Sequence, residues 1–283
     1  LHLSIRRQRQ MCIRDSVGGV YKNGFIDMGN GIAVNSLYSS QYFVAKTNAD
    51  GLANWVANIP VYTGYQGYIK KIITDGSANV YVLTTLFAPN TTAFGCITDT
   101  TYVQVTKLSS TGKILWNKKF DAVGVINAMS LTVDAAGLLN VTGYYAGQAF
   151  IDRYSLQSGF DANCTKNEII HVQMKMTDGS VTGVGRFINQ HTNIIDIKTN
   201  ADGTYYVLGY KINPVRQPKI QGFENAPYSS PTRQLVLQHR FYNGQIIKET
   251  SWNVGSETIF TRSFFTLDAN NDFLIATCGA RYI

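Results

Sequence analysis

Two kinds of short turn alternate along this chain, and the resulting internal repeat is the strongest constraint on its fold. The first kind recurs in four ungapped segments, each with an apolar or β-branched run, an Asp/Asn/Gly turn and a second run. The segments are KIITDGSANVYVLTTL (71–86), SLTVDAAGLLNVTGYY (130–145), DIKTNADGTYYVLGYK (196–211) and FFTLDANNDFLIATCG (264–279). Because Asp, Asn and Gly accept the backbone conformations of tight turns, each segment predicts an antiparallel hairpin.

One position near the end of each segment aligns across the four copies. It is occupied in turn by Thr84, Gly143, Gly209 and Thr277, at spacings of 59 (143 − 84), 66 (209 − 143) and 68 (277 − 209) residues. The chain therefore repeats with a period of 60–70 residues.

A second hairpin lies between successive copies of the first. Its turn glycines are Gly51, Gly112, Gly179 and Gly244, which are 61 (112 − 51), 67 (179 − 112) and 65 (244 − 179) residues apart. Trp55 and Trp116 each follow the glycine by four residues, whereas Gly183 stands at that place in the third copy. Two hairpins per repeat predict four antiparallel strands, and no helical periodicity competes with this interpretation.

A four-stranded antiparallel unit at this period is typical of a β-propeller blade. We therefore predict an all-β fold with full blades over 60–122, 123–190 and 191–256, and partial blades over 17–59 and 257–283. This pattern is expected for an open fragment of a propeller. The alternative is a four-bladed ring closed by a composite blade from the two partial ones. A solenoid of β coils is less favoured because its coils are shorter.

The first sixteen residues, LHLSIRRQRQMCIRDS, differ in composition from the rest of the chain. They hold four arginines and one aspartate, so they carry +3 (4 − 1) of the formal net charge of +7. They resemble translated sequencing-adapter sequence, and we interpret 1–16 as an artefactual or disordered segment ahead of a propeller domain over 17–283. The remaining charge of +4 (7 − 3) is too small to indicate a basic surface for nucleic acid, so we expect no nucleic-acid partner.

Composition and motifs narrow the functional classes. Charged residues make up only 15% of the chain, which argues against a charge-rich disordered protein or a coiled coil. No run of 18 apolar residues predicts a transmembrane helix. The common hydrolase, zinc-protease, Walker and dinucleotide motifs are missing, and no Cys-x-x-Cys pair suggests zinc. We expect no metal and no cofactor, and we favour a non-enzymatic role.

One stretch resembles a known repeat family. The residues FVAKTNADGLANW (43–55), preceded by GFIDMGNG (24–31), are similar to the SBBP-type β-propeller repeat. Partial matches to the pattern lie at 79–85, 101–116, 138–144 and 204–210. The sequence departs from the family at Thr84 and Thr277, where Gly is preferred, and at Gly183, where Trp is preferred. The resemblance implies an extracellular or cell-surface propeller that serves as a binding or structural module.

In a propeller, the short turns lie on one face and the long connections on the other. The long connections are predicted at 87–101, 146–168 and 212–233. Long loops on a rigid scaffold are where binding concentrates, so we expect this face and the adjoining channel mouth to bind a protein or a glycan. The candidate ligand-binding aromatics are Phe94, Tyr144, Tyr145, Tyr210, Phe223 and Tyr228. Cys96 and Cys164, in neighbouring connections, are a candidate disulfide pair, with two free thiols as the alternative.

The sequence thus favours a non-enzymatic, extracellular or surface-exposed interaction module. One alternative is a propeller enzyme, a hydrolase or lyase, with a polar site at the channel mouth. Another is a structural repeat within a large surface or virion protein. The ligand and the oligomeric state stay open at this point.

Overall fold

The all-β prediction is confirmed by a computed structural model of the chain. The structure describes residues 16–21, 24–35, 41–61, 65–88, 101–158, 168–187, 193–200, 202–213, 232–254, 259–267 and 273–280. Every regular element within these ranges is a β-strand, and every strand pair is antiparallel. In the same ranges, no helix is long and apolar enough to cross a membrane.

The strands fall into five consecutive units. Unit 1 contains β1 (Ser16–Tyr21), β4 (Gln41–Thr47) and β5 (Ala53–Ile59), and unit 2 contains β6 (Gln66–Thr74), β7 (Val80–Phe87), β8 (Thr101–Leu108) and the first half of β9 (Ile114–Val133). Unit 3 contains the second half of β9, β10 (Leu138–Ile151), β12 (Glu168–Lys175) and β13 (Val181–Phe187). Unit 4 contains β14 (Asn193–Thr199), β15 (Tyr205–Asn213), β16 (Thr232–Arg240) and β17 (Ile246–Val254), and unit 5 contains β18 (Ile259–Leu267) and β19 (Phe273–Ala280). The short strands β2 (Phe25–Asp27), β3 (Ala33–Asn35) and β11 (Tyr154–Gln157) are additions to this plan.

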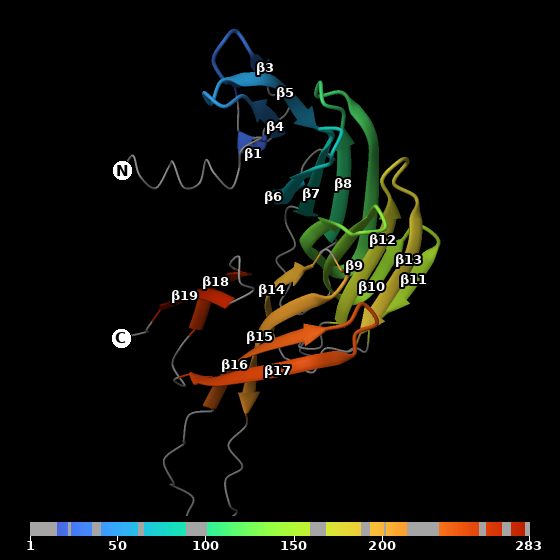
Figure 1. The fold of residues 1–283 in the computed structure, drawn as a ribbon, viewed down its shortest axis with the longest axis vertical. Coiled ribbons are helices and arrows are strands. Elements are labelled where there is room, and N and C mark those ends of the chain that lie inside the picture. The colour runs from blue at the N-terminus through green and yellow to red at the C-terminus, as the bar shows by residue number, and fades with distance from the viewer. Residues whose placement is uncertain are drawn as a thin grey trace, which may run out of the picture.

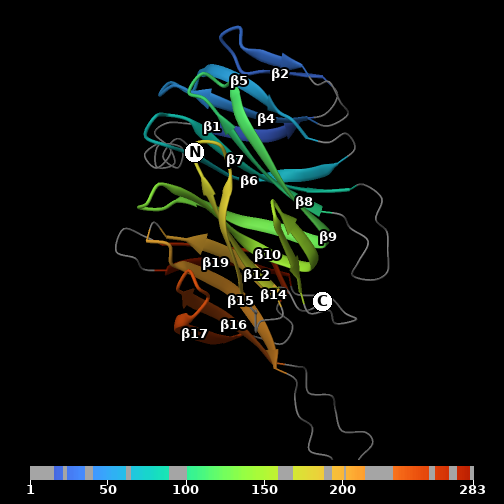
Figure 2. The same cartoon turned by 90° about the vertical axis from the view of Figure 1, so that its right-hand side faces the viewer.

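The units follow one another around an arc that opens toward the left of Figure 1. The view in Figure 2 shows them stacked in chain order from unit 1 to unit 4. The first strands of units 2 to 5, namely β6, the second half of β9, β14 and β18, contact one another in turn and line the inside of the arc.

The arc is open, because the described sheets form no closed barrel or ring. Within the described residues, β18 and β19 pair only with each other, and β1 occupies the edge of β4 that a composite blade would need. The four-bladed ring considered from the sequence is therefore not formed. The first strand of the chain, β1, begins at Ser16, which is the last residue of the segment interpreted as artefactual. Residues 1–15 lie outside the described residues.

Units 2 and 3 share a strand, which the sequence did not predict. The expected boundary at 122/123 falls inside β9, which runs unbroken over 20 residues. Its first half pairs with β8 and its second half with β10, so one continuous sheet spans both units. β10 also continues to Ile151 and pairs with β11. Part of the connection expected at 146–168 is therefore strand.

Six hairpins within the described residues close with the same turn. The first turn residue donates its N–H to the carbonyl four residues later and accepts from the N–H three residues later. These first residues are Asn48, Asp75, Ser109, Asp134, Asn200 and Phe241. The fourth turn residue has a positive φ, which favours glycine, and it is glycine in five of the turns. In the sixth it is Ala78, with φ of 60°.

Those short turns that the structure describes lie at one rim of the arc, and this is where the sequence predicted them. Side chains from one unit bind the turns of the next: Lys46 Nζ donates to the Ala78 carbonyl at 3.2 Å, and Lys107 Nζ donates to the Met176 carbonyl at 2.8 Å. The expected turn at 268–272 lies outside the described residues. The long connections consequently leave from the opposite rim.

In units 1 to 3, an aromatic ring covers the turn glycine of the next unit. Trp55 lies on Gly112, where a Cβ would come within 2.7 Å of the ring, and Trp116 lies on Gly179. Both indoles also donate to carbonyls of those turns, at 2.8 and 3.2 Å. In the third copy, where Gly183 interrupts the Trp spacing, Phe187 covers Gly244 instead. The contact is thus kept where the sequence pattern indicated that it was lost.

The hydrophobic core lies between the units. Alternate residues of each strand point to opposite faces, so every inner sheet buries apolar side chains against both neighbours. Units 1 and 2 meet through residues that include Tyr42, Val44, Ile59, Val80 and Val82. Units 2 and 3 meet through residues that include Val103, Val105, Phe120, Leu131 and Leu139. Units 3 and 4 meet through residues that include Ile169, Ile197, Tyr205 and Val207.

Each inner strand of units 2 to 5 contains a bulge with one extra residue. The extra residues are Lys70, Met129, Ile195 and Thr261. The neighbouring strand places a glycine beside the bulge in units 3 to 5, and Thr84 in unit 2. In unit 5 this glycine is Gly279, and the bulge lies six residues (267 − 261) before the strand end, against four (74 − 70) in unit 2. The bulge is thus displaced by two residues in unit 5, and Thr277 pairs with Ser263 away from it.

The alanine in the positive-φ turn position predicts a stabilising substitution. Replacing Ala78→Gly removes the steric cost of left-handed backbone for an L-residue and should raise the free energy of unfolding by about 1 kcal/mol. Urea denaturation followed by circular dichroism would measure it. Gly137→Ala is the matched control, because Gly137 has φ of 75° in the same kind of turn with nothing within 4 Å of the added Cβ. It should lower stability by a similar amount, and a loss of stability in Ala78→Gly would contradict the argument.

Candidate ligand-binding site

Four side chains gather on and beside the inner strands of units 2 and 3. Tyr68 and Lys70 come from β6, Asn127 from the second half of β9, and Tyr144 from β10. Tyr68 pairs with Thr85, two residues before β7 ends at the rim of the long connections. The group therefore lies at the end of the inner surface where the sequence placed the channel mouth.

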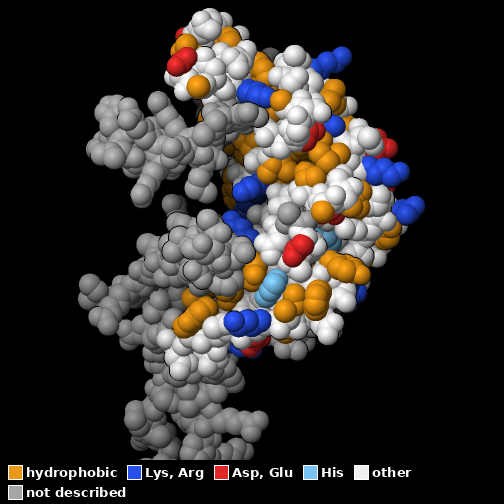
Figure 3. Space-filling model, viewed as in Figure 1, with side chains coloured by type: hydrophobic (Ala, Val, Ile, Leu, Met, Phe, Trp, Pro, Cys, Tyr) orange, Lys and Arg blue, Asp and Glu red, His pale blue; other side chains and the backbone are white. Residues whose placement is uncertain are grey.

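Tyr68 presents an exposed ring with a cation over it. Its side chain is 44% exposed, and the Lys70 ammonium lies 4.3 Å from the ring centroid. Phe87 supports the ring from β7, with centroids 6.4 Å apart. Burial lowers the pKa of Lys70, and the negative charge of Asp196 partly opposes this. The face in Figure 3 shows Lys and Arg side chains beside hydrophobic ones along the inner margin of the arc.

Asn127 orients the second phenol of the site. Its Nδ2 donates to the Tyr144 hydroxyl at 3.0 Å, while its Oδ1 accepts from Thr85 Oγ1 at 3.4 Å. Desolvation raises the pKa of Tyr144, so this hydroxyl stays protonated. Because the oxygen accepts from Asn127, its own hydrogen is left to donate to a ligand.

Unit 4 contributes a carboxylate to the same surface. Asp196 lies on the inner strand β14, and its Oδ2 is 3.5 Å from Lys198 Nζ. Its negative charge raises the pKa of Lys70, against the effect of burial. The inner surface thus carries phenol, amide and ammonium groups in units 2 and 3 and a carboxylate in unit 4.

The structure does not bring the candidate residues named from the sequence together in one site. Tyr144 belongs to this site. Its neighbour Tyr145 points to the opposite face, is 0% exposed and donates to Glu168 Oε2 at 2.8 Å, so it is a core residue. Tyr210 lies on β15 of unit 4, paired with Leu235 and Asn193. The remaining candidates lie outside the described residues: Phe94, Phe223, Tyr228 and the proposed disulfide partners Cys96 and Cys164.

Sequence reasoning missed Tyr68, Lys70 and Asn127. The only signal was the alternation of Tyr68 and Lys70 in a strand, and the bulge at Lys70 interrupts that alternation. Asn127 carried no signal, because it becomes part of the site only when β9 and β10 pair.

A buried polar cluster joins units 3 and 4. Thr199 Oγ1 donates to Thr142 Oγ1 at 3.0 Å, and Thr142 lies 2.9 Å from His171 Nδ1. Either Thr142 Oγ1 or His171 Nδ1 is the donor in this contact, depending on the imidazole tautomer. His171 is 4% exposed and stacks on Tyr205 at a centroid separation of 6.3 Å. Burial lowers its pKa to about 4.

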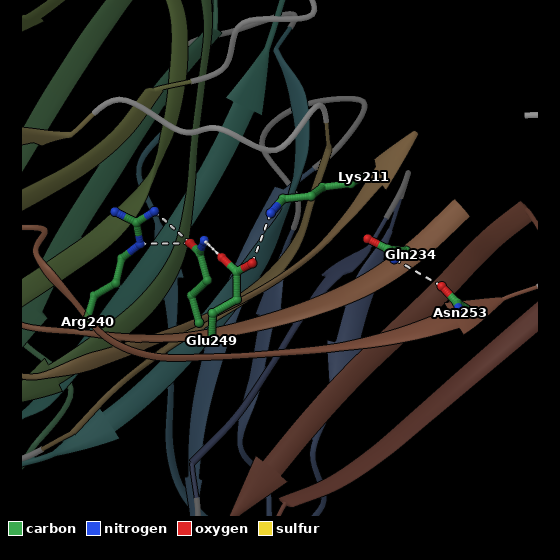
Figure 4. A network of polar contacts seen from close by, with 6 residues as sticks. Lys211, Gln234, Arg240, Glu249 and Asn253 are labelled. Carbon is green, nitrogen blue, oxygen red and sulfur yellow. Dashed lines mark hydrogen bonds and ion pairs between the residues drawn. The ribbon is translucent and has the colours of Figure 1, made fainter. Parts of the chain in front are cut away.

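A polar network holds the outer three strands of unit 4 together (Figure 4). Gln238 accepts from Arg240 Nε at 2.8 Å and donates to Glu249 Oε2 at 2.6 Å, and Lys211 Nζ lies 2.9 Å from Glu249 Oε1. Arg240 also donates to the Gly244 carbonyl at 2.7 Å. Gln238 and Arg240 are buried, so these bonds offset the cost of placing a guanidinium and an amide in the sheet.

Comparison with other proteins adds no family to this description. No protein-family model matches the chain, and no curated protein matches it. Among the described residues, no group of three or more His, Cys, Asp or Glu side chains could hold a metal ion.

The depressed pKa of His171 predicts acid sensitivity. In the unfolded chain His171 binds a proton below about pH 6.5, whereas in the folded chain it binds one only below about pH 4. Stability therefore falls as pH falls through this window. Between pH 7 and pH 5 the loss should be about 2 kcal/mol. His171→Asn keeps an acceptor toward Thr142 without titrating, and its unfolding free energy should fall less over the same interval. Urea denaturation at both pH values tests this. An equal decline in both proteins would show that His171 is not responsible.

Proposed function

We propose that this protein is a non-enzymatic interaction module of the β-propeller type, placed outside the cell or at its surface. The support is the recurrence of antiparallel units with their first strands on the inside of an arc and their short turns on one rim. The resemblance to SBBP-type repeats points to the same class and to the same location.

The observation that carries the binding role is the exposed Tyr68 ring beside the oriented Asn127–Tyr144 pair. A flat phenol ring offers an apolar face to a sugar ring, while amide and hydroxyl groups at its edge match sugar hydroxyls. Lys70 adds a positive charge to this platform. We therefore infer that the ligand is a glycan, with acidic sugars preferred.

The same groups favour binding over bond cleavage. Hydrolysis of a glycosidic bond ordinarily uses two carboxyl groups on opposite sides of the bond. The carboxylate identified at this site is Asp196, which is ion-paired with Lys198. Amide, phenol and ammonium groups orient a ligand without supplying that chemistry.

The proposal predicts that removal of one ring weakens glycan binding. Tyr68→Ala should lower affinity about tenfold, because stacking on an aromatic ring contributes about 1.5 kcal/mol. A glycan array with the unaltered chain would identify the ligand, and calorimetry with both proteins would measure the loss. Tyr242→Ala is the matched control, because Tyr242 is 65% exposed in a turn at the opposite rim. It should bind like the unaltered chain.

Two results would contradict this function. Binding of no acidic or neutral glycan on the array would remove the ligand class, and capture of a protein partner instead would favour the protein-binding alternative. Equal losses in Tyr68→Ala and Tyr242→Ala would show that the effect does not come from the inner surface.

A further inference from the structure

The hairpin between β16 and β17 ends in a group of exposed apolar side chains. Phe241 and Tyr242, in the turn, are 43% and 65% exposed. Ile246 and Ile247, at the start of β17, are 38% and 41% exposed. Isolated apolar residues are normal on a protein surface, whereas a contiguous group of this kind indicates a surface that contacts something else.

Phe241 is not the residue that its turn would favour. The first position of the other five turns is Asn, Asp or Ser, and Asn48 at this position accepts hydrogen bonds from the N–H groups of Asp50 and Leu52. Phe241 has no side-chain acceptor, so its turn lacks this local stabilisation, and the ring stays exposed. A residue that opposes the local pattern in this way is expected at a functional surface.

The corresponding hairpin of unit 2 has the same character, although unit 3 follows it with all four strands. Ile114 and Leu115 lie two and three residues after their turn glycine, as Ile246 and Ile247 do in unit 4. They are 37% and 49% exposed. The exposure of these positions therefore belongs to the hairpins themselves and does not depend on which unit comes next.

Both hairpin tips carry a lysine and no acidic residue. The segment 109–115 contains Lys113 and the segment 241–248 contains Lys248, both exposed, and neither segment contains Asp or Glu. The matching turns of units 1 and 3 contain Asp50 and Asp178 instead. Lysine beside exposed aromatic and aliphatic groups suits the surface of an anionic membrane. The apolar groups enter the boundary of the acyl chains there, and the ammonium groups meet lipid phosphates.

We propose that the hairpin tips of units 2 and 4 dock this protein onto an anionic lipid surface. A membrane is favoured over a single protein partner because the two tips belong to different units on one rim, and a broad surface can contact both. The glycan site lies at the opposite rim, so docking leaves it free. The proposal goes beyond the proposed function and does not rest on it.

Flotation of the full chain with lipid vesicles tests the proposal. Vesicles made of equal parts phosphatidylcholine and phosphatidylserine should carry the unaltered protein upward in a density gradient, whereas aggregated protein would stay at the bottom. Vesicles of phosphatidylcholine alone should carry much less protein. Added salt should weaken binding to the mixed vesicles, because it screens the attraction between lysine and lipid phosphate.

A double variant at the larger tip separates docking from folding. Phe241→Asn introduces the residue type that begins the turn of unit 1, and Tyr242→Ser introduces the residue type at the same place in unit 2, so the turn should still form. Loss of both rings should lower the affinity for mixed vesicles by about tenfold or more. Val123→Thr is the matched control, because Val123 is 52% exposed beyond the end of β9 that pairs with the start of β8. It should float like the unaltered chain.

Two charge variants test the electrostatic part of the docking. Lys248→Gln should lower the affinity for mixed vesicles about fivefold, since one lysine near an anionic surface contributes about 1 kcal/mol. Asp178→Asn removes an exposed acid from the tip of unit 3, between the two docking tips, and should raise the affinity by a similar factor. Asparagine can still accept from Ser180 N–H, as Asp178 does.

Four results would overturn the proposal. The first is an unaltered chain that floats with neither kind of vesicle, and the second is a double variant that floats normally. The third is an equal loss of binding in Val123→Thr. The fourth is capture of a protein by this rim while vesicles are not bound, which would assign the surface to a protein partner. The vesicles contain no sugar and the glycan array contains no lipid, so failure of this proposal and failure of the proposed function are measured separately.

Discussion

Contact between an aromatic ring of one unit and the backbone of the next unit's turn sets the spacing of the whole arc. The ring needs a position without a side chain, which the turn glycine supplies, and the indole of Trp55 or Trp116 needs a carbonyl, which the same turn also supplies. Because this contact fixes one rim, the sheets keep a constant orientation. The inner strands are then close enough for Tyr68, Asn127, Tyr144 and Asp196 to share one surface.

The hairpins could be predicted from the sequence because their chemistry is local. An Asx or Ser residue at the first position binds nearby N–H groups, as Asp75 and Asp134 do, and a glycine usually follows at the fourth position. The limit between units 2 and 3 could not be predicted, since β9 runs through it as one strand and Gly124, despite its positive φ, stays paired with Gly147. The bulges were also hidden, because a single extra residue is visible only in the pairing.

The site was less accessible to sequence reasoning than the fold. Tyr144 was identified, but its neighbour Tyr145 was assigned to the same surface although adjacent strand residues face opposite ways. The cause is that β10 continues to Ile151, beyond the point where a loop was expected. Asn127 and Tyr68 are far apart in sequence, and only the packing of two units gives them a common role.

The unbroken course of β9 has a mechanical consequence. A pulling force along the chain crosses from unit 2 to unit 3 within one continuous strand. The last strand of one sheet is the first strand of the other, so the two sheets cannot be drawn apart by lengthening the chain between them. These two units should therefore yield under load as a single element.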